Sequence, residues 1–239
     1  MPTIKVVYEF EFWNGKRFVH MLRLDKETVS LIPDRTKPLP SWTILEHHQC
    51  TGCPLEGVEI PHCPIAANIA DLVESFKDIR STEDVQIAVR TAERIYLKET
   101  VVQKGLSSIF GIIMATSGCL VMNFLKPMAR YHLPFSTDEE TIIRSISMYL
   151  LSQYFTAKRR GKPDLSLENL NRAYSAVQKV NRGICNRISW AVRQSHSQGD
   201  AANNAVIILN VLSQLLKTEI EWKLDSFAPL FEGIHFFDQ

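Results

Sequence analysis

The sequence predicts an α+β protein, in which an N-terminal antiparallel sheet with one packed helix is followed by a C-terminal α-helical bundle. Apolar residues alternate with period two near the N-terminus, and beyond about residue 100 they recur at helical spacing. With 239 residues, of which 45% are hydrophobic, the chain can bury a sizeable core. We expect a β-rich region over 1–99 and a helical region over 100–239, packed together as one unit.

The first elements form a β-hairpin. Strict alternation places five apolar side chains on one face of the first strand: Ile4, Val6, Tyr8, Phe10 and Phe12. Asn14-Gly15 supplies the positive φ angles of a two-residue turn, and residues 18–24 form the return strand. Residues 28–32 are interpreted as a third short strand, before Pro33, Pro38 and Pro40 interrupt regular structure.

A helix and a further strand complete the β-rich region. Pro64 suits the first turn of a helix, and apolar residues follow at helical spacing up to Phe76. Residues 85–97 then return to period two, which predicts one long strand that rejoins the N-terminal sheet.

Three amphipathic helices are expected in the helical region. Residues 136–139 (Ser-Thr-Asp-Glu) have the form of a capping box, and an apolar stripe follows from Ile142 to Tyr154. A second helix follows Pro163, and Asp200 can cap a third. The stretch between Lys104 and Lys126 carries no charge and is long enough to span a bilayer. Its polar residues and the break at 116–118 predict two short helical pieces and no membrane span.

Composition excludes several classes of function. The 27 basic and 26 acidic residues give a net charge of +1 without a charged tail, so no nucleic-acid partner is indicated. The one dense basic run, at 158–162, is typical of a solvated helix end. No phosphate-binding loop, diagnostic carboxylate pair or nucleophile elbow is present, so no substrate is indicated. The N-terminus lacks the features of a secretory signal, which favours a cytoplasmic protein.

A cluster of soft-metal ligands is the main functional signal. Cys50 and Cys53 form a Cys-x-x-Cys turn around Gly52, and Cys63 follows ten residues later. In a reducing compartment, clustered thiols more often bind metal or act in catalysis than form disulfides. Candidates for a fourth ligand are Cys119, His47, His48, His62 and His132. Cys119 is the most attractive because it lies at an expected helix start, where free amides favour a thiolate. Cys185 lies beside Ile184 and is interpreted as a small core residue.

Two cofactors fit this cluster. Zinc suits a closed site of four cysteines, or three cysteines and one histidine, and is slightly favoured. A [4Fe-4S] cluster also uses four cysteines, and Cys-Pro pairs such as Cys53-Pro54 occur in iron-sulfur ligation. We expect a non-catalytic, metal-binding regulatory or binding module, with an iron-sulfur redox or redox-sensing protein as the alternative. The partner, whether protein or small molecule, and the oligomeric state are not indicated.

A second constellation, residues 128–135, allows a third hypothesis. Arg130 and His132 could bind an anion or serve acid-base chemistry, and Cys119 with His132 could form the nucleophile and base of a cysteine-dependent enzyme. A histidine in a short loop before a helix is more often a hydrogen-bonded structural residue.

The motifs together resemble a family of uncharacterised bacterial cytosolic proteins. They are Cys-x-x-Cys-Pro-Leu at 50–55, Cys-Pro-Ile-Ala at 63–66, Met-Ala-Thr-Ser-Gly-Cys at 114–119 and Met-Ala-Arg-Tyr-His-Leu-Pro-Phe at 128–135. The similarity runs through nearly the full chain, although Leu120 stands where the family pattern often has proline. No activity is implied. The resemblance implies that the motif positions belong together, which favours Cys119 as the fourth ligand.

Overall fold

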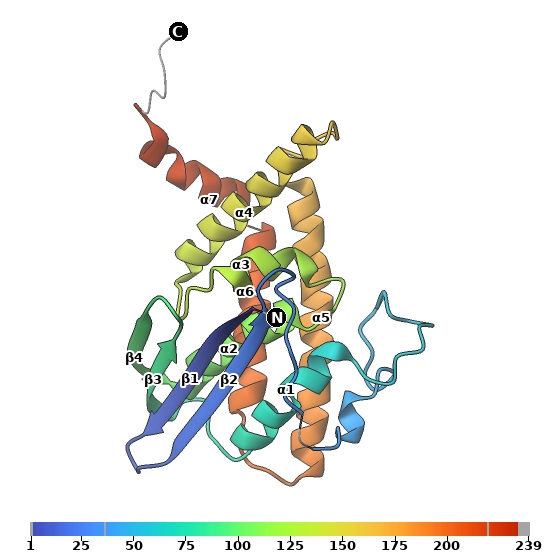
Figure 1. Cartoon of the computed structure of the whole chain (residues 1–239), viewed down its shortest axis with the longest axis vertical. Helices are drawn as coiled ribbons and strands as arrows, with labels where there is room; N and C mark the ends of the chain where they lie inside the picture. Colours follow the sequence, from blue (N-terminus) through green and yellow to red (C-terminus); the bar gives the residue numbers. More distant parts are fainter. Residues whose placement is uncertain (1, 36, 219, 234–239) are drawn as a thin grey trace.

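The computed structural model describes residues 2–35, 37–218 and 220–233. Its sheet has four antiparallel strands in the order β2-β1-β3-β4: β1 (Thr3–Phe12), β2 (Arg17–Asp25), β3 (Asp84–Arg90) and β4 (Ile95–Val101). Figure 1 shows this sheet on one side of the molecule, with the helices behind and above it. The predicted α+β class is confirmed.

The hairpin has the predicted strands, but its turn differs from the predicted two-residue turn. Phe12 N donates to Lys16 O around a three-residue loop, in which Gly15 has a positive φ and Asn14 does not. Phe10 lies opposite Phe18, and Val6 lies opposite Leu22. The alternating side chains of β1 are buried, and Tyr8 and Phe10 are inaccessible to solvent. Pleat alternation therefore fixed which face of the strand meets the core.

Two strand predictions were wrong. The single long strand over 85–97 is a hairpin, because residues 91–94 form a turn in which Thr91 N donates to Arg94 O. Residues 28–32 form no strand and make only the isolated bridge Leu24–Leu31. Val29 has a φ of 54°, in the left-handed region that extended strands do not use.

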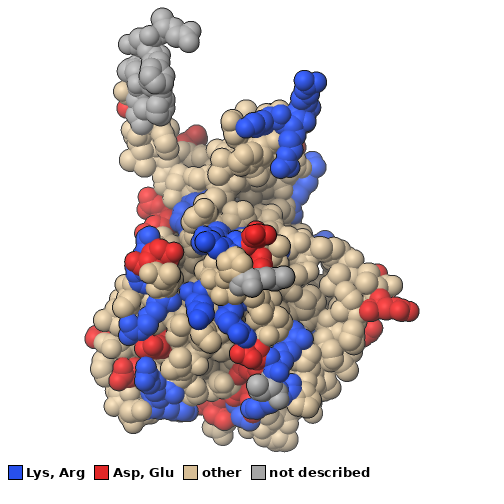
Figure 2. Space-filling view, in the orientation of Figure 1, with Lys and Arg blue, Asp and Glu red and all other residues tan. Residues whose placement is uncertain are grey.

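Helices α1 (Pro64–Phe76) and α2 (Val102–Thr116) cover one face of the sheet. The Phe76 ring lies 5.0 Å from the Phe10 ring and 4.6 Å from the Phe18 ring. A Cβ on Gly105 would lie 2.6 Å from Phe10 Cε1, so glycine permits close contact between α2 and the sheet. The opposite face is exposed and carries Arg17 and Arg90 paired with Glu9. Figure 2 shows both signs of charge mixed over this side of the molecule.

The helical region continues with η2 (Asn123–Leu125), α3 (Lys126–Arg130), α4 (Asp138–Lys158), α5 (Glu168–Gln194), α6 (Ala201–Thr218), α7 (Ile220–Phe227) and η3 (Ala228–Phe231). Another short 3-10 helix, η1 (Ser41–Thr43), precedes α1. The expected break after Thr116 is present. None of the helices in the described ranges has the length and apolar character needed to cross a membrane.

Helix α4 differs from its prediction in two ways. Its capping box is formed by Thr137 and Glu140, one residue later than expected. The apolar stripe is buried only in its first half, at Ile142 and Ile146, whereas Tyr154 near its end is 59% exposed. The second half of α4 extends beyond the body of the protein (Figure 1), so it has less core to contact. Figure 2 shows basic side chains at its tip, where the run at 158–162 ends the helix.

The stripe predicted for α5 is buried over its whole length: Leu167, Leu170, Tyr174, Val177, Asn181, Ile184 and Ile188. Asp200 precedes α6 as expected, but its carboxylate accepts from Ser81 N at 2.7 Å and so binds the segment before β3. One continuous core contains residues of the sheet, α1, α2, α5 and α6.

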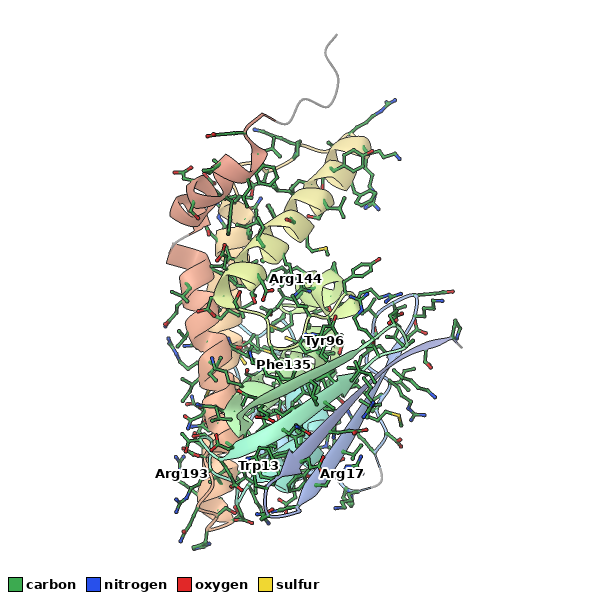
Figure 3. All side chains as sticks on the ribbon, turned by 90° about the vertical axis from the view of Figure 1, so that its left-hand side faces the viewer. Trp13, Arg17, Tyr96, Phe135, Arg144 and Arg193 are labelled. Carbon is green, nitrogen blue, oxygen red and sulfur yellow. The ribbon has the colours of Figure 1, made fainter. Side chains whose placement is uncertain are left out.

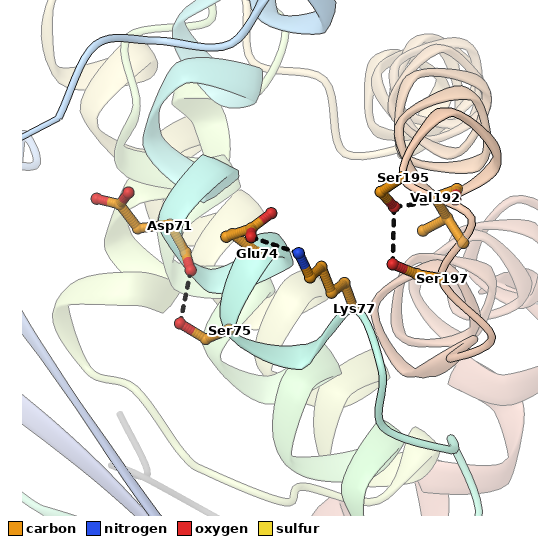
Figure 4. A network of polar contacts seen from close by, with 7 residues as sticks. All are labelled: Asp71, Glu74, Ser75, Lys77, Val192, Ser195 and Ser197. Atoms are coloured by element: carbon orange, nitrogen blue, oxygen red, sulfur yellow. Dashed lines mark hydrogen bonds and ion pairs between the residues drawn. The ribbon is translucent and has the colours of Figure 1, made fainter.

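The polar side chains at the ends of α1 and α5 make local contacts with one another near the surface (Figure 4). Lys77 Nζ lies 2.7 Å from Glu74 Oε1, and the hydroxyls of Ser195 and Ser197 are 2.7 Å apart. Exposed contacts of this kind add little stability, so the helix ends depend on the core beneath them.

Candidate metal centre

The loop that carries Cys50 and Cys53 is closed at its base. Cys63 N donates to Thr43 O at 2.8 Å, and Leu45 N donates to Pro61 O at 3.1 Å. These bonds pair the two ends of the loop, so residues 46–60 project from a fixed stem.

Arg187 fastens this stem to α5. Its Nη1 donates to Trp42 O at 2.9 Å and to Ile44 O at 2.6 Å, and its Nη2 donates to Leu45 O at 2.6 Å. The side chain is 1% exposed, and its Nε is buried without a hydrogen-bond partner. Among the described residues no ion pair involves it. A buried cation that meets only carbonyl dipoles is costly and needs negative charge nearby.

The four predicted cysteines meet in one place. Cys50 and Cys53 lie on a turn in which Cys53 N donates to Cys50 O at 3.0 Å and Gly52 has a φ of +73°. Cys63 immediately precedes α1, and Cys119 follows α2. All four line a single small cavity of about 80 Å³, which α5 closes on one side. Three segments far apart in the sequence thus bring four thiols together.

The surroundings of Cys119 differ in detail from the prediction. It lies after the end of α2 and not at the start of a helix, because Gly118, with a φ of +90°, turns the chain there. Burial raises the pKa of its thiol. The backbone N–H groups of Val121 and Met122 oppose this increase, although Met122 N also donates to Cys119 O at 3.0 Å.

Burial also controls the protonation of Cys50. It raises the pKa of this thiol to about 12, the neighbouring Cys63 and Cys53 add to the increase, and Arg187 opposes it. The Cys50 thiol is therefore neutral unless another cation takes the place of its proton, as a thiophilic metal ion does on binding.

The sulfurs are close but not gathered around one point. Cys50 Sγ contacts Val180 O on α5 at 4.0 Å, and a Cβ added at Gly183 would lie 2.6 Å from this sulfur. Within 2–35, 37–218 and 220–233, no group of three or more His, Cys, Asp or Glu side chains is already arranged to hold a metal ion. A single ion would require the four thiols to draw closer together.

The candidate histidines have other contacts. His62 Nδ1 lies 2.8 Å from Thr43 Oγ1, and the His47 ring packs 4.5 Å from the Trp190 ring and 4.7 Å from the His48 ring. None of these three histidines is among the side chains that line the cysteine cavity.

The second constellation lies elsewhere. His132 Nε2 is 2.6 Å from Tyr8 Oη and 3.4 Å from Ser108 Oγ, and burial lowers the pKa of the imidazole to about 3. The Arg130 guanidinium lies 5.3 Å from the centre of the Tyr131 ring. Cys119 and His132 line different cavities, so the geometry offers no contact between nucleophile and base.

The sequence interpretation missed the contribution of α5. Arg187 is a charged residue immediately before Ile188 on a buried stripe, and Gly183 is a glycine in a helix interior. Both residues depart from the apolar stripe of this helix, and the sequence shows these departures. No motif or spacing in the sequence connects either residue to the cysteines. Cys185 on the same helix is half-buried and lies outside the cavity.

Comparison with known proteins identifies only a family. The model of a family described as a domain of unknown function, DUF6901, matches residues 6–232. No curated protein and no solved structure matches the chain.

Proposed function

Because the chain belongs to the DUF6901 family, whose function is unknown, we propose its function from the cysteine cavity. Cys50, Cys53, Cys63 and Cys119 bind a metal centre, and the protein is a non-catalytic binding or regulatory module. The observation that supports this is the presence of four thiols from three separate segments in one small cavity. Thiolate ligands suit zinc and iron-sulfur clusters.

The charge of the surroundings supports the same proposal. Four thiolates around Zn²⁺ carry a net charge of −2, and Arg187 is buried nearby without an acidic partner among the described residues. The bound centre would supply the negative charge that this guanidinium lacks. The amide of Val121 would donate to the sulfur of Cys119 in the same state.

With zinc, the centre would have a structural role. It would join the loop over 46–60 and the turn after α2 to the start of α1, so metal affinity would contribute directly to folding stability. Zinc is spectroscopically silent, and the protein would be colourless.

One observation favours a [4Fe-4S] cluster as the second candidate. The space among the cysteines is about 80 Å³, several times the roughly 10–15 Å³ that one water-sized sphere occupies. A cube of iron and sulfide keeps its four cysteine ligands farther apart than a single ion does, and the thiols are not drawn around one point. The function would then be electron transfer or redox sensing.

One experiment separates these proposals. The full chain is purified anaerobically without chelators and examined by elemental analysis and visible spectroscopy. One zinc per chain without colour supports the structural zinc site. Iron with sulfide and a broad visible absorbance that bleaches on reduction supports the cluster. Protein without metal, which also fails to bind Zn²⁺ or reconstituted iron and sulfide, would refute the four-cysteine centre.

Matched variants assign the ligands. Cys119→Ser should lose the metal, because Cys119 is the ligand that connects the loop to the helical region, whereas Cys185→Ser should retain it. Circular dichroism of each variant shows whether the fold is present when metal is measured. Retention of full metal content by a folded Cys119→Ser protein would exclude this residue as a ligand.

A further inference from the structure

A second and larger cavity lies beside the cysteine centre. It has a volume of about 500 Å³ and is enclosed by β4, α2, α5, α6 and the segment from α3 to the start of α4. This volume is within the range of small-molecule binding sites, about 300–1,000 Å³. Apolar side chains form most of its interior: Ile112, Met114, Met122, Leu209, Leu212 and Leu216.

Three positively charged side chains line this cavity. Lys98 on β4 and Lys104 on α2 are exposed, and Arg144 on α4 is half-buried. Asp138 is the one acidic residue among the described side chains that line the cavity, and outside its wall Glu140 is close enough to Arg144 to oppose the lowering of the Arg144 pKa by burial. Positive charge therefore exceeds negative charge on the cavity wall. Figure 3 shows Arg144 in the space between the sheet and the helices, with Tyr96 and Phe135 below it.

Arg144 is held in place by backbone carbonyls, and Lys98 lies near an aromatic ring. Arg144 Nη2 donates to Tyr131 O at 2.6 Å and to Met128 O at 3.3 Å, which leaves its charge without an ion pair among the described residues. Lys98 Nζ lies 5.9 Å from the centre of the Phe135 ring. Phe135 adopts a φ of +59°, which is unusual for a bulky residue and indicates that the surrounding structure fixes this corner.

His132 on the cavity wall belongs to a hydrogen-bonded chain. Its Nε2 lies 2.6 Å from Tyr8 Oη, which lies 2.8 Å from Ser108 Oγ. Burial raises the pKa of Tyr8, so its hydroxyl stays protonated, and lowers the pKa of His132 to about 3, so the imidazole is neutral and adds no positive charge to the cavity.

Asn181 is an independent sign of a ligand. It is 1% exposed on α5 and lines the cavity, and its Oδ1 is buried with no hydrogen-bond partner among the described residues. Its Nδ2 reaches Ser213 Oγ only at 3.5 Å. Buried amide oxygens are rarely left unpaired, so a donor on a bound molecule would satisfy this group.

From this arrangement we propose that the large cavity binds an amphipathic monocarboxylate. The carboxylate lies at the end formed by Lys98, Lys104 and Arg144, and the apolar body occupies the space among the methionine and leucine side chains. A hydroxyl group on the body strengthens binding where it donates to Asn181 Oδ1. This site does not depend on the metal centre, and neither proposal requires the other.

Binding is tested with decanoate, decylamine and decanol, which share a chain length and differ in charge. Isothermal titration of the full chain should show one site for decanoate, with at least tenfold weaker binding of decylamine and decanol. Equal binding of all three, tighter binding of the amine, or no binding of any would overturn the proposed ligand class.

Variants locate the site. Lys98→Gln with Lys104→Gln should weaken decanoate binding about tenfold, since each exposed cation contributes a modest attraction. Lys26→Gln, at an exposed lysine outside the cavity, should leave binding unchanged. Unchanged affinity in the double variant would refute the charged end.

Filling the cavity provides a second test. A Cβ on Gly111 would meet only Leu209 Cδ2, at 4.0 Å, so a larger side chain can enter the open space. Gly111→Leu should abolish decanoate binding, while Gly111→Ala should retain it. Binding that persists in a folded Gly111→Leu protein would place the ligand elsewhere and overturn the proposal.

Discussion

Replacing Arg187 by methionine should destabilise the protein strongly, because this one side chain connects the stem of the cysteine loop to α5. Methionine has a similar length but no donors, so the carbonyls of Trp42, Ile44 and Leu45 lose their partner. Each buried carbonyl left without a donor costs about 1–3 kcal/mol, which gives roughly 3–9 kcal/mol for three. Removal of a buried cation also relieves its desolvation cost. We therefore expect a loss of about 3–5 kcal/mol in the free energy of unfolding, as when one partner of a buried charged network is removed.

The assay is urea unfolding followed by circular dichroism, with the midpoint and slope fitted for each variant. Arg182→Met is the matched control because Arg182 is exposed on the same helix, and its effect should be within about 0.5 kcal/mol. A loss below about 1 kcal/mol for Arg187→Met, with an unchanged slope, would show that the guanidinium does not hold the loop.

Two further predictions concern glycines and pH. Gly183→Ala should destabilise the protein and weaken metal binding, because the new Cβ would lie 2.6 Å from Cys50 Sγ. Gly111→Ala, in an open helix position, should instead stabilise the protein by about 0.5–1 kcal/mol. Thermal melts of both variants check this prediction, and equal effects would contradict it. His132 titrates near pH 6.5 when unfolded and at about 3 when folded, so the unfolded chain binds more protons between these values. Stability should therefore fall as pH drops from 6.5 towards 3, by up to about 1.4 kcal/mol per unit, and His132→Gln should show a shallower fall in urea midpoints. Parallel pH profiles would show that His132 is not the titrating group.

Local pattern was sufficient for most of the sheet and for the amphipathic helices. The alternation in β1 and the stripe of α5 each encode which side of an element faces the core, and neighbours in the sequence carry that information. The patterns failed where context decides. Residues 85–97 have apolar residues at every second position on both sides of the turn at 91–94. Each strand of the β3–β4 hairpin alternates by itself, so the alternation does not show that the chain reverses direction between them. Tyr154 continues an apolar stripe although α4 has left the body of the protein.

The candidate centre was predictable in part. Clustering in the sequence identified Cys50, Cys53 and Cys63. Cys119 was favoured by an expected helix start, which the structure does not have at this position, and by the resemblance of the motifs to a family. That these four line one cavity depends on how α1 and α2 pack against α5, which no spacing in the sequence contains. The metal itself stays a prediction.

By itself, the sequence determined the α+β class, the first hairpin, the helical faces and the four cysteines, because periodicity and residue chemistry are local properties. Only the tertiary structure decided that Arg187 is buried against the stem of the loop and that His62 bonds to Thr43 outside the cysteine cavity. It alone revealed the apolar cavity with Asn181 and three cations on its walls. Each of these features is a convergence of distant segments, and the packing of the whole chain sets which side chains meet.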